Sequence, residues 1–128
     1  MATMAIVNFL AACIGIFLGT LFGAVLGLFF QREEWLGGYA SWPRRMLRLA
    51  HISFFGLALL NLAFWLGVNA LGLGRIFWPS RLLILAAVTM PLVCCLAAWR
   101  KPLRHLFPIP ALSAITGSGI FLWRLLAA

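Results

Sequence analysis

The chain lacks aspartate altogether, and its only two acidic residues, Glu33 and Glu34, lie outside the long apolar stretches. Cation- and proton-coupled transporters usually carry a carboxylate within a membrane-spanning segment, so this composition argues against coupled transport. The sequence also lacks paired carboxylates, a nucleophile–base set and a phosphate-binding loop. We therefore expect no catalytic residues and no enzymatic activity from this chain alone.

Cysteine is scarce as well. Cys13, Cys94 and Cys95 all lie in apolar stretches, and their spacing fits neither a disulfide framework nor a zinc site. Free cysteine behaves as a small apolar residue in helix packing. We expect that packing role here, and no metal site.

Apolar residues dominate what is present. They make up 65% of the 128 residues, whereas charged residues make up 9%. A soluble domain of this size cannot bury so much apolar surface, so the expected surroundings are a lipid bilayer, and the expected location is a prokaryotic cytoplasmic (inner) membrane. The net charge of +8 would suggest nucleic acid in a soluble protein, but here the basic residues stand in short connections between apolar segments. We therefore expect no nucleic-acid partner.

Four apolar segments are long enough, or nearly so, to cross a membrane. They cover approximately residues 5–30, 49–71, 82–99 and 107–126, against the roughly 20 residues that a spanning helix needs. Short connections place successive helices antiparallel. The sequence therefore predicts an all-α integral membrane protein: one domain, residues 1–128, forming a compact antiparallel bundle of four transmembrane helices.

The basic residues predict the orientation. The first and third connections together hold seven Lys and Arg residues, whereas the second holds only Arg75 and Arg81. Positively charged connections remain in the cytoplasm, so both termini are expected outside (N-out/C-out). Anionic lipid head groups are the expected partners of six basic residues near the inner surface: Arg44, Arg45, Arg48, Arg100, Lys101 and Arg104.

Small and polar residues within the spans predict helix packing. Gly15, Gly19, Gly23 and Gly27 recur every four residues, the pattern that allows two helices to approach closely in lipid. The contact lies either within the bundle or with another subunit. Asn61 lies near the middle of its span and needs a hydrogen-bond partner there. The expected candidates on other helices are Thr20, Ser113, Thr116 and Ser118.

His51 and His105 are the only histidines, and both are expected near the cytoplasmic face. Two histidines at one depth suggest axial ligation of a b-type haem, with nearby arginines pairing with its propionates. The same histidines also suggest a quinone site. The simpler alternative is that each histidine meets water, lipid phosphate or a neighbouring side chain.

The abundance of packing residues and the scarcity of reactive groups favour a small accessory or anchoring subunit of a larger membrane complex. Other membrane subunits and anionic lipids are then its partners. A respiratory or photosynthetic electron-transfer assembly is the host suggested by analogy. Two alternatives stay open. One is a haem b- or quinone-binding subunit that uses His51 and His105, and the other is a small oligomeric channel or transporter.

Overall fold

The computed structural model describes residues 2–74 and 76–128, with side chains from residue 6 onward. Four α-helices and two short 3₁₀ helices make up this part of the chain, and it contains no strand. The elements are α1 (Ala2–Phe30), η1 (Trp35–Gly37), α2 (Trp42–Ala70), α3 (Phe77–Trp99), η2 (Lys101–Leu106) and α4 (Pro108–Leu126). All four α-helices are long and apolar enough to cross a membrane, which confirms the prediction of an all-α protein with four such helices.

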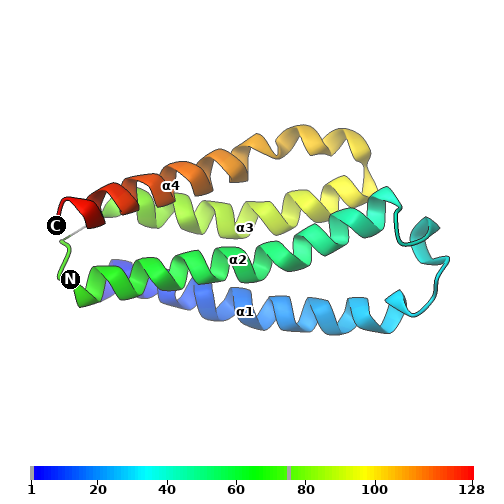
Figure 1. Cartoon of the computed structure of the whole chain (residues 1–128), viewed down its shortest axis with the longest axis horizontal. Coiled ribbons are helices and arrows are strands. Elements are labelled where there is room, and N and C mark those ends of the chain that lie inside the picture. The colour runs from blue at the N-terminus through cyan, green and yellow to red at the C-terminus, as the bar shows by residue number, and fades with distance from the viewer. Residues whose placement is uncertain (1, 75) are drawn as a thin grey trace.

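The helices run up and down and pack mainly in chain order. α2 lies between α1 and α3, and α3 also packs against α4. Figure 1 shows both chain ends at the same end of the bundle, with α1 and α4 at opposite edges. The arrangement is therefore closer to a folded row of helices than to a closed square.

Two helices begin earlier than the hydrophobic pattern predicts. α2 starts at Trp42 and α3 at Phe77, rather than near residues 49 and 82. The Ser41 hydroxyl caps α2 by accepting a hydrogen bond of 3.4 Å from the backbone N–H of Arg44. Pro43 and Pro79 each occupy the first turn of their helix, where the missing N–H of proline costs nothing. These prolines therefore begin helices rather than interrupt them.

Three glycines of the four-residue repeat face α2. A Cβ atom added to Gly15 would lie 3.1 Å from Cβ of Ala58, and one added to Gly19 would lie 3.0 Å from Cβ of Phe54. A Cβ added to Gly23 would collide with the imidazole of His51. Glycine at these positions lets the two helices approach closely. Gly27 has no neighbour within 4 Å of such a Cβ, so its surface is open.

Apolar contacts attach α4 to the rest of the bundle. Phe64 of α2, Leu83 of α3 and Phe121 of α4 form a buried cluster, and the two phenyl rings meet edge to face with centroids 5.0 Å apart. Gly117 allows α4 to approach α3, because a Cβ there would lie 3.1 Å from Cβ of Leu82. Gly117 thus brings the two helices close together, whereas Gly119 has no neighbour within 4 Å of an added Cβ.

Candidate functional site

A buried polar cluster ties α1, α2 and α3 together. The side-chain amide of Asn8 donates to Oδ1 of Asn61 at 2.7 Å and to the backbone oxygen of Ser80 at 3.3 Å. The hydroxyl of Ser80 donates back to Oδ1 of Asn8 at 2.5 Å. Both asparagines are fully buried. Every polar group that enters an apolar interior needs a partner, and this cluster satisfies that need across three helices.

The partners expected for Asn61 were wrong. Its amide donates to the backbone oxygens of Leu57 at 2.9 Å and Leu83 at 3.1 Å. The hydroxyls of Thr20, Ser113 and Ser118 instead donate to carbonyls one turn earlier in their own helices. Hydroxyl groups on helices readily make this local bond, which leaves Asn8 as the side-chain partner of Asn61.

Arg44 requires a second correction, because it is only 3% exposed and therefore does not face lipid head groups. Its guanidinium donates to the backbone oxygens of Glu33 at 3.0 Å and Phe30 at 3.2 Å. It also lies 4.6 Å from the centre of the Phe30 ring. The last carbonyls of a helix lack intrahelical donors and attract positive charge. Arg44 thus caps the end of α1 from the first turn of α2.

Trp42 makes the matching contact to α3. Its indole N–H donates to the backbone oxygen of Ala97 at 2.8 Å, near the C-terminal end of that helix. The first turn of α2 therefore holds the last turns of both its neighbours.

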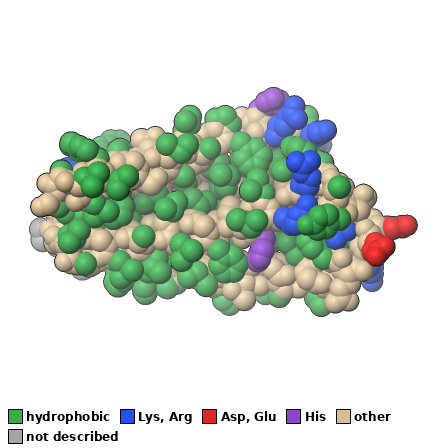
Figure 2. All heavy atoms as spheres, viewed as in Figure 1, with side chains coloured by type: hydrophobic (Ala, Val, Ile, Leu, Met, Phe, Trp, Pro, Cys, Tyr) green, Lys and Arg blue, Asp and Glu red, His purple; other side chains and the backbone are tan. Residues whose placement is uncertain are grey.

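Most of the other basic residues gather at this same end of the bundle, as Figure 2 shows, whereas Arg81 and Arg124 lie near the opposite end. Arg45, Arg100, Lys101 and Arg104 are exposed. Arg48 is half-buried, donates to the backbone oxygen of Tyr39 at 3.0 Å and lies 4.1 Å from its ring centre. With two carboxylates in the chain against ten basic residues, most of this charge has to be balanced from outside. Arg75, which belongs to the expected orientation pattern, lies outside the described residues.

The structure does not bring the two histidines together. His51 lies on α2 against Gly23 of α1, and its ring meets that of Phe55 edge to face with centroids 5.3 Å apart. His105 is exposed in η2, which packs against α3 and α4. Figure 2 shows the two imidazoles well separated on the surface. One haem therefore cannot take both as axial ligands in this arrangement.

Each histidine has its own surroundings. Nδ1 of His51 is buried and has no hydrogen-bond partner among the described residues. His105 borders a shallow hollow of about 330 Å³ with Lys101, Pro102 and Arg104. The described part of the chain holds no group of three potential metal-binding side chains.

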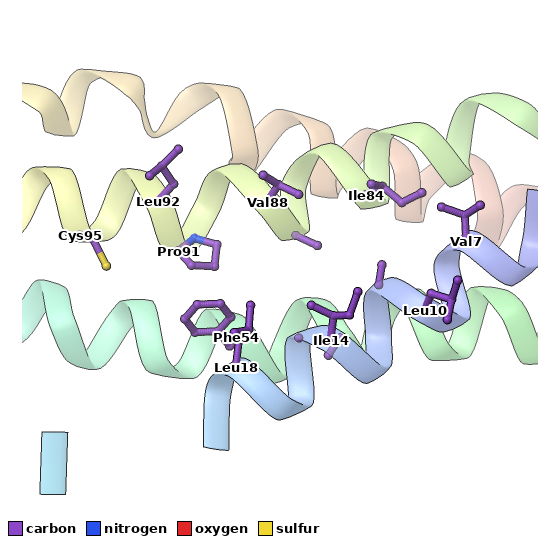
Figure 3. A pocket seen from close by; sticks show the side chains of 14 residues that line it. Val7, Leu10, Ile14, Leu18, Phe54, Ile84, Val88, Pro91, Leu92 and Cys95 are labelled. Carbon is purple, nitrogen blue, oxygen red and sulfur yellow. The ribbon is translucent and has the colours of Figure 1, made fainter. Parts of the chain in front are cut away.

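An apolar groove of about 630 Å³ lies between α1 and α3, with α2 contributing to its lining. We call it the α1–α3 groove (Figure 3). From α1 it is lined by Val7, Leu10, Ala11, Ile14, Gly15 and Leu18, from α2 by Phe54 and Ala58, and from α3 by Ile84, Ala87, Val88, Pro91, Leu92 and Cys95. Its only heteroatom-bearing side chain is the thiol of Cys95, so it suits a hydrocarbon ligand.

The two ends of the groove differ. At one end, which we call the tied end, hydrogen bonds join α1 to α3, and the other end approaches the basic surface. Near Val7 and Ile84, α1 and α3 are joined through the Asn8–Ser80 hydrogen bonds. Toward the other end the lining continues along α3 to Cys95. Residues four apart share a helix face, so Trp99 follows Cys95 on the face that lines the groove. Trp99 is 78% exposed, and the guanidinium of Arg100 lies 5.2 Å from its ring centre.

Sequence reasoning missed Asn8, Ser80 and the groove. A signal for Asn8 existed, because an asparagine close to the start of an apolar segment needs a partner just as Asn61 does. No local sequence pattern predicts the groove. It arises where α1 and α3 separate, and that separation depends on how both helices pack against α2.

Comparison of the chain with protein-family models, with curated proteins and with solved structures finds no match to any of the three. The residues and their arrangement are therefore the basis for a function.

Proposed function

We propose that this chain is an integral membrane protein of N-out/C-out orientation that serves as a small accessory subunit of a larger membrane complex. Four helices of sufficient length support membrane insertion. The basic residues at the end formed by the α1–α2 and α3–α4 connections support a cytoplasmic position for that end. No reactive group in the site described above supports catalysis instead.

One observation carries the accessory role: α1 leaves a small-residue face unused. The most apolar stretch of α1 is 17% buried, as little as that of the segment containing α4 and less than the 33% of α3. Thr20, Ala24 and Gly27 are exposed and share one side of the helix by their spacing. Small residues on a lipid-exposed face permit close approach of another helix. Gly15, Gly19 and Gly23 already contact α2, so a partner subunit would pack beside them, on this remaining face.

The experiment is purification of the tagged chain from its native membrane in mild detergent, followed by mass spectrometry of the proteins present in fixed ratio. The variant Ala24→Trp places a bulky side chain on the exposed face of α1 and is expected to remove the partners. Ala63→Trp is the matched control, because Ala63 is also exposed but lies on α2. Partners that survive Ala24→Trp as well as Ala63→Trp would contradict the use of this face.

The remaining candidates have less support. The haem alternative needs His51 and His105 together, and they are apart. A quinone site at His51 has the unpartnered Nδ1 in its favour, and quinone-dependent changes in the spectrum of the purified chain would test it. The small oligomeric channel or transporter stays a prediction, which solute or ion flux in proteoliposomes would test. The electron-transfer host stays a prediction, to be decided by the co-purifying subunits.

A further inference from the structure

We propose that the α1–α3 groove holds an acyl chain of an anionic glycerophospholipid, whose phosphate binds at Arg100 beside Trp99. The inference rests on the membrane location proposed above. It names a ligand and a site for it, whereas the accessory role concerns a different face of α1.

The length of the groove fits a lipid acyl chain. Its lining extends along α3 from Ile84 to Cys95, which corresponds to about 16 Å along a helix. This is close to half of the roughly 30 Å hydrocarbon thickness. The acyl chain of one lipid leaflet spans this half, so its length matches that of the groove.

The lining chemistry agrees with hydrocarbon. Ala11, Gly15, Ala58 and Ala87 leave space between the larger aliphatic side chains of the lining. The polar side chains near the groove lie at its tied end, where Asn8 and Ser80 form hydrogen bonds with each other. Nothing along the groove thus demands a hydrogen-bonding ligand, and a flexible apolar chain fills its irregular width.

Positive charge near one end of the groove favours an anionic lipid head group. Trp99 continues the groove-lining face of α3 by helical spacing, and Arg100 lies over its ring. Lys101 follows directly and lies 5.4 Å from the ring centre of Trp42. Arg100 and Lys101 are exposed. Tryptophan favours the membrane interface, and cations beside it attract a phosphate-bearing anionic lipid. A lipid whose chain follows the groove toward its tied end therefore places its phosphate among these residues.

Photo-crosslinking in vesicles tests the proposal with the full chain. The membrane is phosphatidylcholine with a trace of phosphatidylglycerol that carries a diazirine in its acyl chain, and the labelled residues are mapped by mass spectrometry. A second sample carries the same diazirine chain on phosphatidylcholine. We expect labels from phosphatidylglycerol to concentrate on groove residues such as Ile14 and Val88, above the level at exposed Leu59 of α2.

Two pairs of variants separate the chain site from the head-group site. Ala87→Trp fills the groove and is expected to abolish its labelling, whereas Ala63→Trp on the exposed side of α2 leaves it unchanged. Arg100→Gln is expected to lower groove labelling by phosphatidylglycerol about fivefold, the equivalent of ~1 kcal/mol per basic residue near a membrane surface. Arg45→Gln is the control on another exposed arginine of the same end.

The outcomes are distinguishable. Even labelling around all four helices would overturn the groove site while leaving the membrane location intact. Equal groove labelling by the two lipids would overturn the anionic specificity. A groove protected from both probes while other apolar faces are labelled would also overturn the lipid site and indicate a protein segment in its place. Absence of labels on every apolar helix would overturn the membrane location itself.

Discussion

Asn8 and Asn61 are separated by 53 residues in sequence, yet the amide of one donates to the amide oxygen of the other at 2.7 Å in a fully buried position. The substitution Asn8→Leu removes this bond and leaves the Ser80 hydroxyl without its acceptor. We expect unfolding in detergent to become easier by about 1–2 kcal/mol, the range for a hydrogen bond between membrane helices. Denaturant titration followed by circular dichroism measures it.

Asn69→Leu is the matched control for that substitution. Asn69 is exposed, and its amide donates only to the backbone oxygen of Trp65 within its own helix. Little change in stability is therefore expected. An effect of equal size in both variants would mean that the loss of an asparagine, rather than the loss of the interhelical cluster, sets the stability.

The contact between Gly23 and His51 gives a second prediction. Gly23→Ala introduces a Cβ that collides with the imidazole, and overpacking of this kind costs about 1–3 kcal/mol. The double variant Gly23→Ala/His51→Ala is expected to recover most of that loss, because the obstructing ring is gone. Thermal unfolding in detergent measures all three proteins. Gly27→Ala is the control, since its added Cβ meets open space, and failure of the double variant to recover would contradict the predicted contact.

Arg44 gives a third prediction. Arg44→Gln shortens the donor group that reaches the carbonyls of Phe30 and Glu33. Hydrogen bonds from a charged group contribute about 1.5–3 kcal/mol, so the last turn of α1 is expected to open more often. Hydrogen exchange of the backbone amides over residues 26–36 measures this local opening.

Two controls define the role of Arg44. Arg45→Gln removes a neighbouring exposed arginine and is expected to leave exchange unchanged. Arg44→Lys keeps the charge but loses the planar fork that reaches two carbonyls at once, so it is expected to restore the protection only partly. Full protection in Arg44→Lys would show that charge alone is sufficient.

The proposed orientation gives a fourth prediction. In a background with Cys13, Cys94 and Cys95 replaced by alanine, single cysteines are placed at Tyr39 in the first connection and at Gly72 in the second. An impermeant maleimide added outside intact cells is expected to label the cysteine at position 72 and not that at position 39, because basic connections remain inside. The reverse labelling would invert the proposed orientation.

The sequence was sufficient to predict the number of long apolar helices. Each of the four apolar runs approaches or exceeds the roughly 20 residues that a membrane-spanning helix needs. It was insufficient for their starting points. Trp42 and Pro43 resemble a break when the pattern is read for hydrophobicity alone, whereas the Ser41 hydroxyl and the fixed backbone angle of proline begin a helix there.

The candidate site was harder to predict. From the sequence, Arg44 is one more basic residue in a connection. In the structure α2 begins at Trp42, so Arg44 lies in the first turn of that helix. The distance between His51 and His105 depends on which side of each element faces its neighbours. Sequence spacing within one helix predicts a shared face, but spacing between helices does not predict which faces meet.

The first turn of α2 has a consequence for the order in which the protein is made. Arg44 supplies the donors for the end of α1, and Trp42 supplies one for the end of α3. During synthesis α1 leaves the ribosome before Arg44 does, so its terminal carbonyls depend on the surrounding water until the next helix arrives. α3 finds its partner indole already in place. Under the proposed membrane location, insertion of α1 and α2 as a single hairpin is therefore the route that supplies the last carbonyl of α1 with its donor soonest.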